Sequence, residues 1–411
     1  MRRIAANYMF PVDGEPVKNG YIEVDDNGTI IGSGRLTDEL EDTEFYNGII
    51  CPGFVNAHCH VELSHLAGYF KEDTGMSGFI NQINALRLTV DKEGRLNAIN
   101  EQMDKMYREG VNGMGDISNC SESFAKKASS PIFTHTYLEQ FGWAVDECGA
   151  IMDNARKLLS CADSFGLAAS ITPHSCYTMC PELLESCIAA GLERGYISYH
   201  SQESPEEEEL IRTGTGNLAD NYRGRNMPTP KVTGKSALNY FIMHAKSAVH
   251  RGQLKVKQME NGEYAGEKIK GKVLLVHNVT ADRESINEAL QTFENVYWAT
   301  CPLSNWFIHR QYAPLNLMHS MGLKVCIGTD SLSSNHRLSM IDEMKFIMSV
   351  FKEIPLADII KWGTLNGAEA IGADNLLGSF TIGKKPGVVL IENADLATLS
   401  LTEQSISKRL V

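Results

Sequence analysis

Several apolar, β-prone runs in this chain end in a residue type that binds metal ions. The runs cover residues 49–57, 196–199, 272–276 and 324–329, and they lead into His58-Cys59-His60, His200, His277 and Asp330. Side chains alternate along an extended strand, so His58 and His60 point the same way and can converge on one cation. One such histidine is more often a satisfied core residue. Four strand ends of this kind favour a shared site, and the fold must bring them together.

A (β/α)8 barrel meets that requirement, because the C-terminal ends of its parallel strands open on one face. Helical periodicity over residues 77–107, 146–164 and 181–194 separates β-prone segments, an alternation typical of parallel βαβ units. Eight strands are predicted, leading into His58, over residues 111–117, 132–138, 168–172 and 196–200, and near residues 273, 296 and 324. The predicted fold class is therefore α/β, a (β/α)8 TIM barrel.

The length of 411 residues exceeds the roughly 250 residues of a typical barrel and leaves room for a small second domain. Residues 1–50 are β-rich around a turn signal at 25–28, and short β segments return from residue 378. We expect a small β-domain built from residues 1–50 plus 378–411, beside a barrel of residues 51–377. The least regular stretch, 204–271, is expected to lie partly over the mouth of the active site.

Composition excludes several classes of protein. A net charge of −13 argues against binding a nucleic-acid polymer, which requires basic surface. No apolar run approaches the ~20 residues that span a bilayer, and the N-terminus lacks the apolar stretch of a signal peptide. Ten cysteines without a regular framework are typical of reduced thiols, which predicts a cytoplasmic protein. The acidic run 206–209 is expected to be the solvated first turn of a helix.

Taken together, the motifs resemble the amidohydrolase superfamily, most closely its cytosine-deaminase-like and chlorohydrolase-like branch. They are Asn56-Ala57-His58-Cys59-His60, His200 with Glu203, Val276-His277-Asn278, Cys301-Pro302-Leu303-Ser304-Asn305 and Gly328-Thr329-Asp330. The resemblance covers nearly the whole chain. It implies that one divalent metal ion, zinc with iron or nickel as alternatives, is held by His58, His60, His200 and Asp330. The two-metal branch carries a bridging lysine on a middle strand, and residues 131–141 and 168–178 contain none.

The same resemblance assigns catalytic roles. Asp330 would bind the metal and accept a proton from the hydrolytic water. His277 would orient the hydroxide and stabilise the developing oxyanion. Glu203 would protonate a ring nitrogen of the substrate and pass a proton to the leaving group. From the residues alone, Glu203 is equally well explained as a carboxylate at the start of a helix.

Four residues are candidate substrate contacts: His174, Glu62, Asn305 and Ser331. The pattern around His174, Pro-His-x-x-Tyr-Thr, resembles that of nucleoside-deaminating relatives, which makes it the candidate partner of a purine ring. Each of the others has an alternative role as a helix cap or as a partner of the backbone. Residues 56–64 and 328–335 most resemble the aminodeoxyfutalosine deaminases, which remove the purine amine from a menaquinone precursor. Ser175-Cys176 departs from the Ala-Pro that relatives usually carry.

The predicted function is that of a metal-dependent hydrolase acting on a C–N bond. Its substrate would be an aminated purine nucleoside or a related heterocycle, a small molecule that loses ammonia. A chlorohydrolase or cyclic amide hydrolase of the same fold is the first alternative. An inert small-molecule-binding barrel is the second, and the presence of all four ligand-type residues argues against it. The resemblance leaves open whether the chain forms a homodimer.

Overall fold

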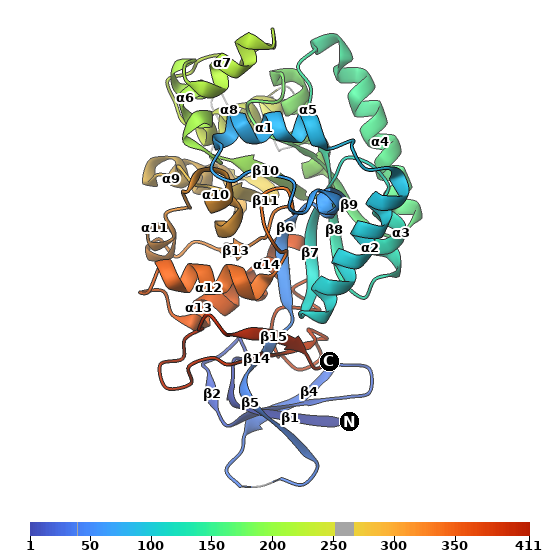
Figure 1. The fold of residues 1–411 in the computed structure, drawn as a ribbon, viewed down its shortest axis with the longest axis vertical. Coiled ribbons are helices and arrows are strands. Elements are labelled where there is room, and N and C mark those ends of the chain that lie inside the picture. Colours follow the sequence, from blue (N-terminus) through green and yellow to red (C-terminus); the bar gives the residue numbers. More distant parts are fainter. Residues whose placement is uncertain (39, 251–266) are drawn as a thin grey trace.

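The computed structural model describes residues 1–38, 40–250 and 267–411. Figure 1 shows helices surrounding strands in the upper part of the molecule, with a separate sheet below that holds both chain ends. The upper part contains two four-stranded sheets, with orders β6-β7-β8-β9 and β10-β11-β12-β13. Every strand pair in these two sheets is parallel. Their C-terminal ends therefore lie on one side.

A strand occupies each of the eight predicted positions. The strands are β6 (Phe54–Cys59), β7 (Val111–Ser118), β8 (Phe133–Gln140), β9 (Ala168–Pro173), β10 (Tyr196–Ser201), β11 (Ile269–His277), β12 (Phe293–Thr300) and β13 (Val325–Ile327). All six residues of β6 and all three of β13 are buried. Strands buried on both faces read as continuous apolar runs, which is why the sequence pattern located them.

The two sheets meet at both edges. Between β9 and β10, the backbone N–H of His200 donates to the carbonyl of His174 at 3.0 Å. Between β13 and β6, the N–H groups of Thr329 and Asp330 donate to the carbonyl of His58 at 3.0 and 3.1 Å. Strand ends that are far apart in sequence are thereby brought into contact.

Helices follow most of the strands. They are α1 (Gly75–Leu86), α2 (Lys92–Arg108), α3 (Phe124–Ser129), α4 (Cys148–Ser164), α5 (Pro181–Glu193), α9 (Arg283–Thr292), α10 (Pro302–His309), α11 (Leu315–Ser320), α12 (Met340–Val350), α13 (Leu356–Trp362) and α14 (Leu365–Ile371), with short 3-10 helices η1 (Val61–Leu66) and η2 (Val145–Glu147). The helical segment predicted over 77–107 is two helices. Asp91 begins the second one, because its side chain accepts a hydrogen bond from the N–H of Gly94 at 2.9 Å.

The stretch predicted to be least regular contains three helices, α6 (Pro205–Thr213), α7 (Asn217–Gly224) and α8 (Ala237–His250). Part of the predicted segment, residues 251–266, lies outside the described residues. The acidic run does begin a helix, capped by Ser204. The prediction that this run is exposed to solvent is wrong for Glu207 and Glu208, which are buried. Glu207 lies inside because it accepts a hydrogen bond from the N–H of Glu203 at 2.6 Å.

Strands from both chain ends form the lower, seven-stranded sheet. They are β1 (Arg2–Met9), β2 (Val17–Lys18), β3 (Gly20–Val24), β4 (Ile30–Arg35), β5 (Thr43–Pro52), β14 (Val388–Glu392) and β15 (Ile406–Arg409). The C-terminal strands join the N-terminal ones through antiparallel pairing of β14 with β5. Ile4, Ile22, Ile50 and Leu390 form part of a core separate from that of the upper sheets. This sheet leads directly into β6 through Gly53.

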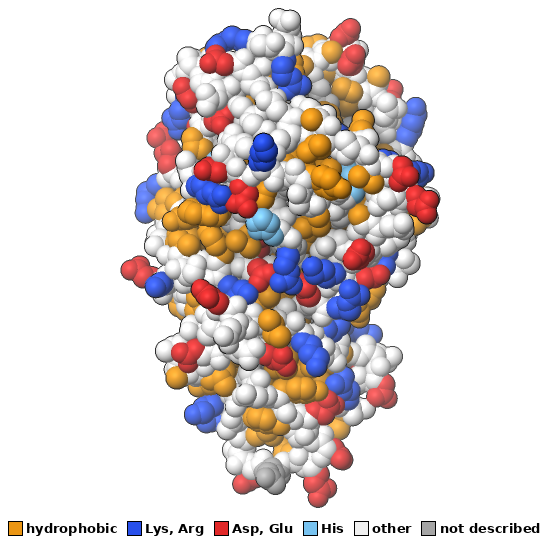
Figure 2. All heavy atoms as spheres, in the orientation of Figure 1, with side chains coloured by type: hydrophobic (Ala, Val, Ile, Leu, Met, Phe, Trp, Pro, Cys, Tyr) orange, Lys and Arg blue, Asp and Glu red, His pale blue; other side chains and the backbone are white. Residues whose placement is uncertain are grey.

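The surface carries charges of both signs. Figure 2 shows acidic side chains interspersed with basic ones over the face in view. None of the helices in the described part of the chain is both long and apolar enough to cross a membrane.

A buried ion pair supports the loop that follows the first histidine pair. Lys127 Nζ lies 2.5 Å from Asp116 Oδ2, and both side chains are fully buried. The other oxygen of Asp116 accepts a hydrogen bond from the N–H of Val61 at 2.8 Å. The pair therefore connects β7, α3 and the residue directly after His60.

We predict that Asp116→Ala lowers the free energy of unfolding by about 3–5 kcal/mol, because it leaves the charge of Lys127 buried without a partner. Urea denaturation would measure the loss. The matched control is Asp153→Ala, which removes an exposed ion pair with Arg156 and should cost about 0–1 kcal/mol. Equal effects of the two substitutions would contradict a structural role for the buried pair.

Candidate active site

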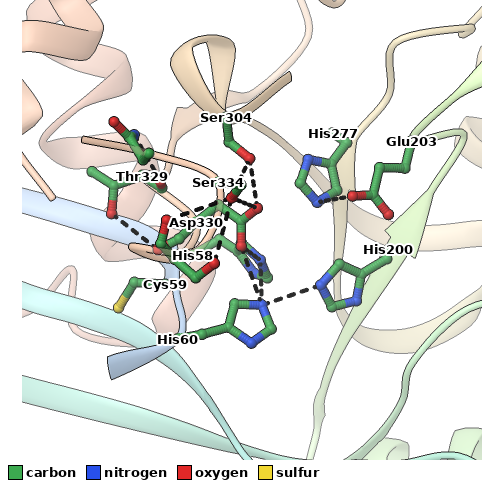
Figure 3. A network of polar contacts seen from close by, with 12 residues as sticks. His58, Cys59, His60, His200, Glu203, His277, Ser304, Thr329, Asp330 and Ser334 are labelled. Carbon is green, nitrogen blue, oxygen red and sulfur yellow. Dashed lines mark hydrogen bonds and ion pairs between the residues drawn. The ribbon is translucent and has the colours of Figure 1, made fainter. Parts of the chain in front are cut away.

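Three histidines at the ends of β6 and β10 converge at the C-terminal side of the upper sheets (Figure 3). The Nε2 atom of His60 lies 3.1 Å from that of His58 and 3.3 Å from that of His200. Two nitrogen ligands at the Zn–N distance of 2.0–2.1 Å in a tetrahedral site would stand roughly 3.4 Å apart. The spacing of these imidazoles therefore fits a shared metal ion.

Asp330 completes the group directly after β13. Its Oδ1 atom lies 3.4 Å from His60 Nε2 and 3.7 Å from His58 Nε2. Its Oδ2 atom accepts hydrogen bonds from the hydroxyls of Ser304 at 2.6 Å and Ser334 at 2.9 Å. One carboxylate oxygen is thus held in place while the other faces the imidazoles. The structure brings together all four of the predicted ligands.

Glu203 and His277 lie beside this cluster. Glu203 Oε1 is 3.5 Å from His277 Nε2, and the hydroxyl of Tyr177 donates to Glu203 Oε2 at 3.2 Å. On the far side of the imidazole, the amide nitrogen of Asn305 lies 3.1 Å from His277 Nδ1. With this amide orientation Nδ1 accepts a hydrogen bond, so the ring proton sits on Nε2 and faces the carboxyl group.

Burial sets the protonation of this pair. It lowers the pKa of His277 to about 3, so the imidazole is neutral at pH 7. Burial also raises the pKa of Glu203, and the negative charges of Asp330 and Glu207 raise it further. A neutral imidazole and a carboxyl group with a raised pKa therefore stand side by side, and a raised pKa suits proton donation to a substrate.

The backbone turns sharply where these side chains converge. His277, Asn278 and Asp330 have φ angles of 74°, 57° and 56°, and Gln202 next to Glu203 has 50°. Few non-glycine residues adopt this left-handed region, and histidine, asparagine and aspartate are among those that do so most readily. Such conformations concentrate at functional sites, where the surrounding structure holds them in place.

A cavity of about 470 Å³ opens above the cluster. Its lining includes His60, His200, Glu203 and Asp330, together with apolar residues of α1 and residues 222–228. Four residues of the 204–271 stretch, Tyr222, Arg225, Met227 and Pro228, line this cavity. The expectation that part of the stretch covers the mouth of the active site stays a prediction.

The four candidate substrate contacts divide into two groups. His174 and Ser331 line the cavity. His174 also stacks on His200, with ring centroids 4.6 Å apart. Glu62 and Asn305 are outside the lining. Glu62 accepts a hydrogen bond from the N–H of Asn119 at 2.9 Å, whereas Asn305 contacts His277.

Sequence reasoning missed Glu139, at the end of β8. Its buried Oε1 lies 3.4 Å from His200 Nδ1, on the side of the ring opposite His60. A carboxylate there can hold the ring so that Nε2 faces the metal position. The signal was available, because residues 133–138 also form a β-prone run that leads into an acidic residue.

Residues 49–407 match the sequence model of the Amidohydrolase family. The chain belongs to this family. It is an amidohydrolase, a metal-dependent hydrolase acting on C–N bonds, and the cluster at its strand ends supplies donor groups for a divalent metal.

The sequence identity between this chain and individual relatives is low. The amidohydrolase is 26% identical to an adenosine deaminase of Helicobacter pylori over 343 residues, covering 80% of this chain and 76% of that protein. Its fold matches the crystal structure of Helicobacter pylori aminofutalosine deaminase in complex with methylthio-coformycin, with a TM-score of 0.77, 21% identity and 100% of both chains covered. It also matches atrazine chlorohydrolase of Arthrobacter aurescens complexed with zinc, with a TM-score of 0.72, 14% identity and 98% and 90% covered. The two structural likenesses show the fold.

We predict that His200→Ala lowers the metal content of the purified amidohydrolase well below that of the unchanged protein, because it removes one of the converging nitrogens. Elemental analysis by mass spectrometry would measure metal per chain. His336→Ala is the control, since that imidazole is 75% exposed and outside the cluster. An unchanged metal content in His200→Ala would remove this residue from the ligand set.

Proposed function

We propose that this amidohydrolase deaminates an aminated purine nucleoside or a related heterocycle. The observation that carries the proposal is the buried pair of Glu203 and His277 beside the four ligand-type residues. The names of two relatives, an adenosine deaminase and an aminofutalosine deaminase, support a purine-type substrate.

The proposed ligands of a single zinc ion are His58, His60, His200 and Asp330. Three imidazoles and a carboxylate form a donor set that zinc accepts readily, and iron or nickel would fit the same atoms. The zinc in the chlorohydrolase structure supports this choice. When bound, such a metal lowers the pKa of a water ligand to about 7 and makes hydroxide available.

The protein's own residues would manage the protons. Asp330, with one oxygen held by Ser304 and Ser334, would accept the proton that leaves the attacking water. His277 would donate a hydrogen bond from Nε2 to the oxygen being added, which orients it and stabilises its charge. Glu203 would donate its proton to the adjacent ring nitrogen, then take up the proton of the added hydroxyl and pass it to the exocyclic amine. The proton held by Asp330 would return to Glu203 and restore both groups. The C–N bond breaks and ammonia leaves.

His174 and Ser331 are the proposed substrate contacts, because both line the cavity. For Asn305 we propose support of His277, and for Glu62 support of the loop at Asn119. Neither Asn305 nor Glu62 lines the cavity. Asn305 contacts His277, and Glu62 contacts the N–H of Asn119.

We further propose that the two upper sheets form one closed (β/α)8 barrel of residues 51–377. The hydrogen bonds at both edges support closure. The seven-stranded sheet would be the small β-domain of residues 1–50 plus 378–411, and its separate hydrophobic cluster supports this division. All ten cysteines are free thiols, which supports a cytoplasmic location.

A second candidate is hydrolysis of another leaving group, such as chloride. The likeness to atrazine chlorohydrolase favours keeping it, because the same metal and acid can serve a different bond. Ammonia release distinguishes the two candidates. A panel of adenosine, S-adenosylhomocysteine, methylthioadenosine, aminodeoxyfutalosine, guanine and cytosine should yield ammonia from at least one nucleoside. Silence across the panel from metal-loaded enzyme would overturn the proposed deamination of a purine nucleoside.

We predict that Glu203→Gln reduces ammonia release by about 10² or more, because glutamine keeps the shape of the side chain and loses its proton. Metal content should stay near that of the unchanged enzyme, since Glu203 is outside the proposed ligand set. Glu209→Gln is the matched control, as this carboxylate is exposed on α6. Normal activity in Glu203→Gln would show that the residue is not the proton donor.

A further inference from the structure

Two thiols meet beside the cavity. The Sγ atoms of Cys148 and Cys180 lie 3.3 Å apart, although the two residues are 32 positions apart in the sequence. Both are free thiols, and no other two thiols hydrogen-bond to each other within the described part of the chain. Cys148 is the first residue of α4, and Cys180 directly precedes α5. The contact therefore joins the beginnings of two helices.

The two thiols differ in their exposure to solvent. Cys148 is partly exposed, and its neighbours Glu147 and Gly149 are exposed. Cys180 is buried. An oxidant from solution can therefore reach Cys148 first, and a second thiol is already in contact with it to complete a disulfide. An accessible thiol next to a resolving thiol is a recurring arrangement at redox-sensitive sites.

The contact is close to two segments that line the cavity. One segment is 141–143, which leads toward α4, and the other is 177–178, which leads toward α5. Their backbones are paired. The N–H of Gly142 donates to the carbonyl of Thr178 at 2.9 Å, and the carbonyl of Gly142 accepts from the N–H of Cys180 at 2.9 Å. A movement of Cys180 would therefore be passed to both segments.

A disulfide at this position would also alter the support of the proposed proton donor. The two sulfur atoms would have to approach from 3.3 Å to a bond length of about 2.05 Å. Cys180 is three residues after Tyr177, whose hydroxyl donates to Glu203 Oε2 at 3.2 Å. A shift of this segment would change the hydrogen bond that holds the carboxyl group, and a small misplacement of a catalytic group slows a reaction.

We propose that Cys148 and Cys180 are a site of reversible oxidation, at which a peroxide forms a disulfide that slows turnover. Hydrogen peroxide would convert the Cys148 thiol to a sulfenic acid and release one water molecule. The Cys180 sulfur would then attack the sulfenic sulfur, which forms the S–S bond and releases a second water molecule. In total, two thiols lose two electrons and two protons, and the peroxide is reduced to water. The disulfide goes beyond the proposed function, and its effect on rate rests on that function.

A third thiol offers a competing outcome. Cys187 of α5 contacts Met152 Sδ at 3.6 Å and interacts electrostatically with both Cys148 and Cys180, so it could resolve the sulfenic acid instead. Loss of surrounding water and the hydrogen bond with Cys180 raise the pKa of Cys148 to about 12. The reactive thiolate is therefore scarce at neutral pH, and oxidation should become faster as the pH rises.

The test treats metal-loaded enzyme with hydrogen peroxide at mildly alkaline pH, followed by digestion and mass spectrometry. We expect one pair of peptides linked through Cys148 and Cys180, lighter than the two reduced peptides by two hydrogen atoms. We expect kcat/KM for ammonia release to fall about tenfold, because the support of Glu203 is displaced. Dithiothreitol should remove the link and restore the rate.

Cys148→Ser and Cys180→Ser each remove one of the two thiols, so each variant should keep its rate through the same treatment. Cys161→Ser is the control, because this partly exposed thiol on α4 is outside the pair and its loss should leave the link unchanged. A link through Cys187, a sulfinic acid at Cys148 without a link, or a linked enzyme with an unchanged rate would overturn the proposal. If no nucleoside releases ammonia, the proposed function fails, and the mapped link alone then upholds or overturns the oxidation site.

Discussion

The carbonyl oxygen of His58 accepts two backbone hydrogen bonds, from the N–H groups of Thr329 and Asp330. This contact joins the residues after β13 to the end of β6, although they are more than 270 positions apart in the sequence. It places the carboxylate of Asp330 beside the imidazoles of His58 and His60, which no local interaction would do. Asn56 reinforces the join, because its side chain both donates to and accepts from Thr329. The relative position of the proposed ligands depends on these backbone hydrogen bonds.

Much of the site follows from two regularities of sequence. Period-two alternation puts His58 and His60 on one face, and parallel strands bring His200, His277 and Asp330 to the same side. What the sequence does not reveal depends on packing between distant segments. Glu207 is in an acidic run that looks solvated, yet its contacts with Glu203 and Cys176 bury it.

The removal of water makes the chemistry of the site possible. Burial raises the pKa of Glu203, with Asp330 and Glu207 adding to the shift, and burial lowers the pKa of His277 to about 3, so that this imidazole is neutral. The serine hydroxyls on Asp330 and the amide of Asn305 then fix which atom of each group faces inward. Protonation and orientation are therefore set by the same buried contacts, so the groups need little rearrangement when a substrate arrives.

The cavity is assembled from two kinds of structure. Its floor comes from strand ends, whereas another part of its wall comes from α1 and from residues 222–228, which include the end of α7 and the residues after it. These wall segments contribute none of the ligand-type residues, yet both contact Tyr177, which supports the proposed acid. The hydroxyl of Tyr222 donates to the carbonyl of Tyr177, and the hydroxyl of Tyr177 contacts both Met76 Sδ and Glu203 Oε2. A change of sequence in the wall would therefore alter the support of Glu203 as well as the shape of the cavity.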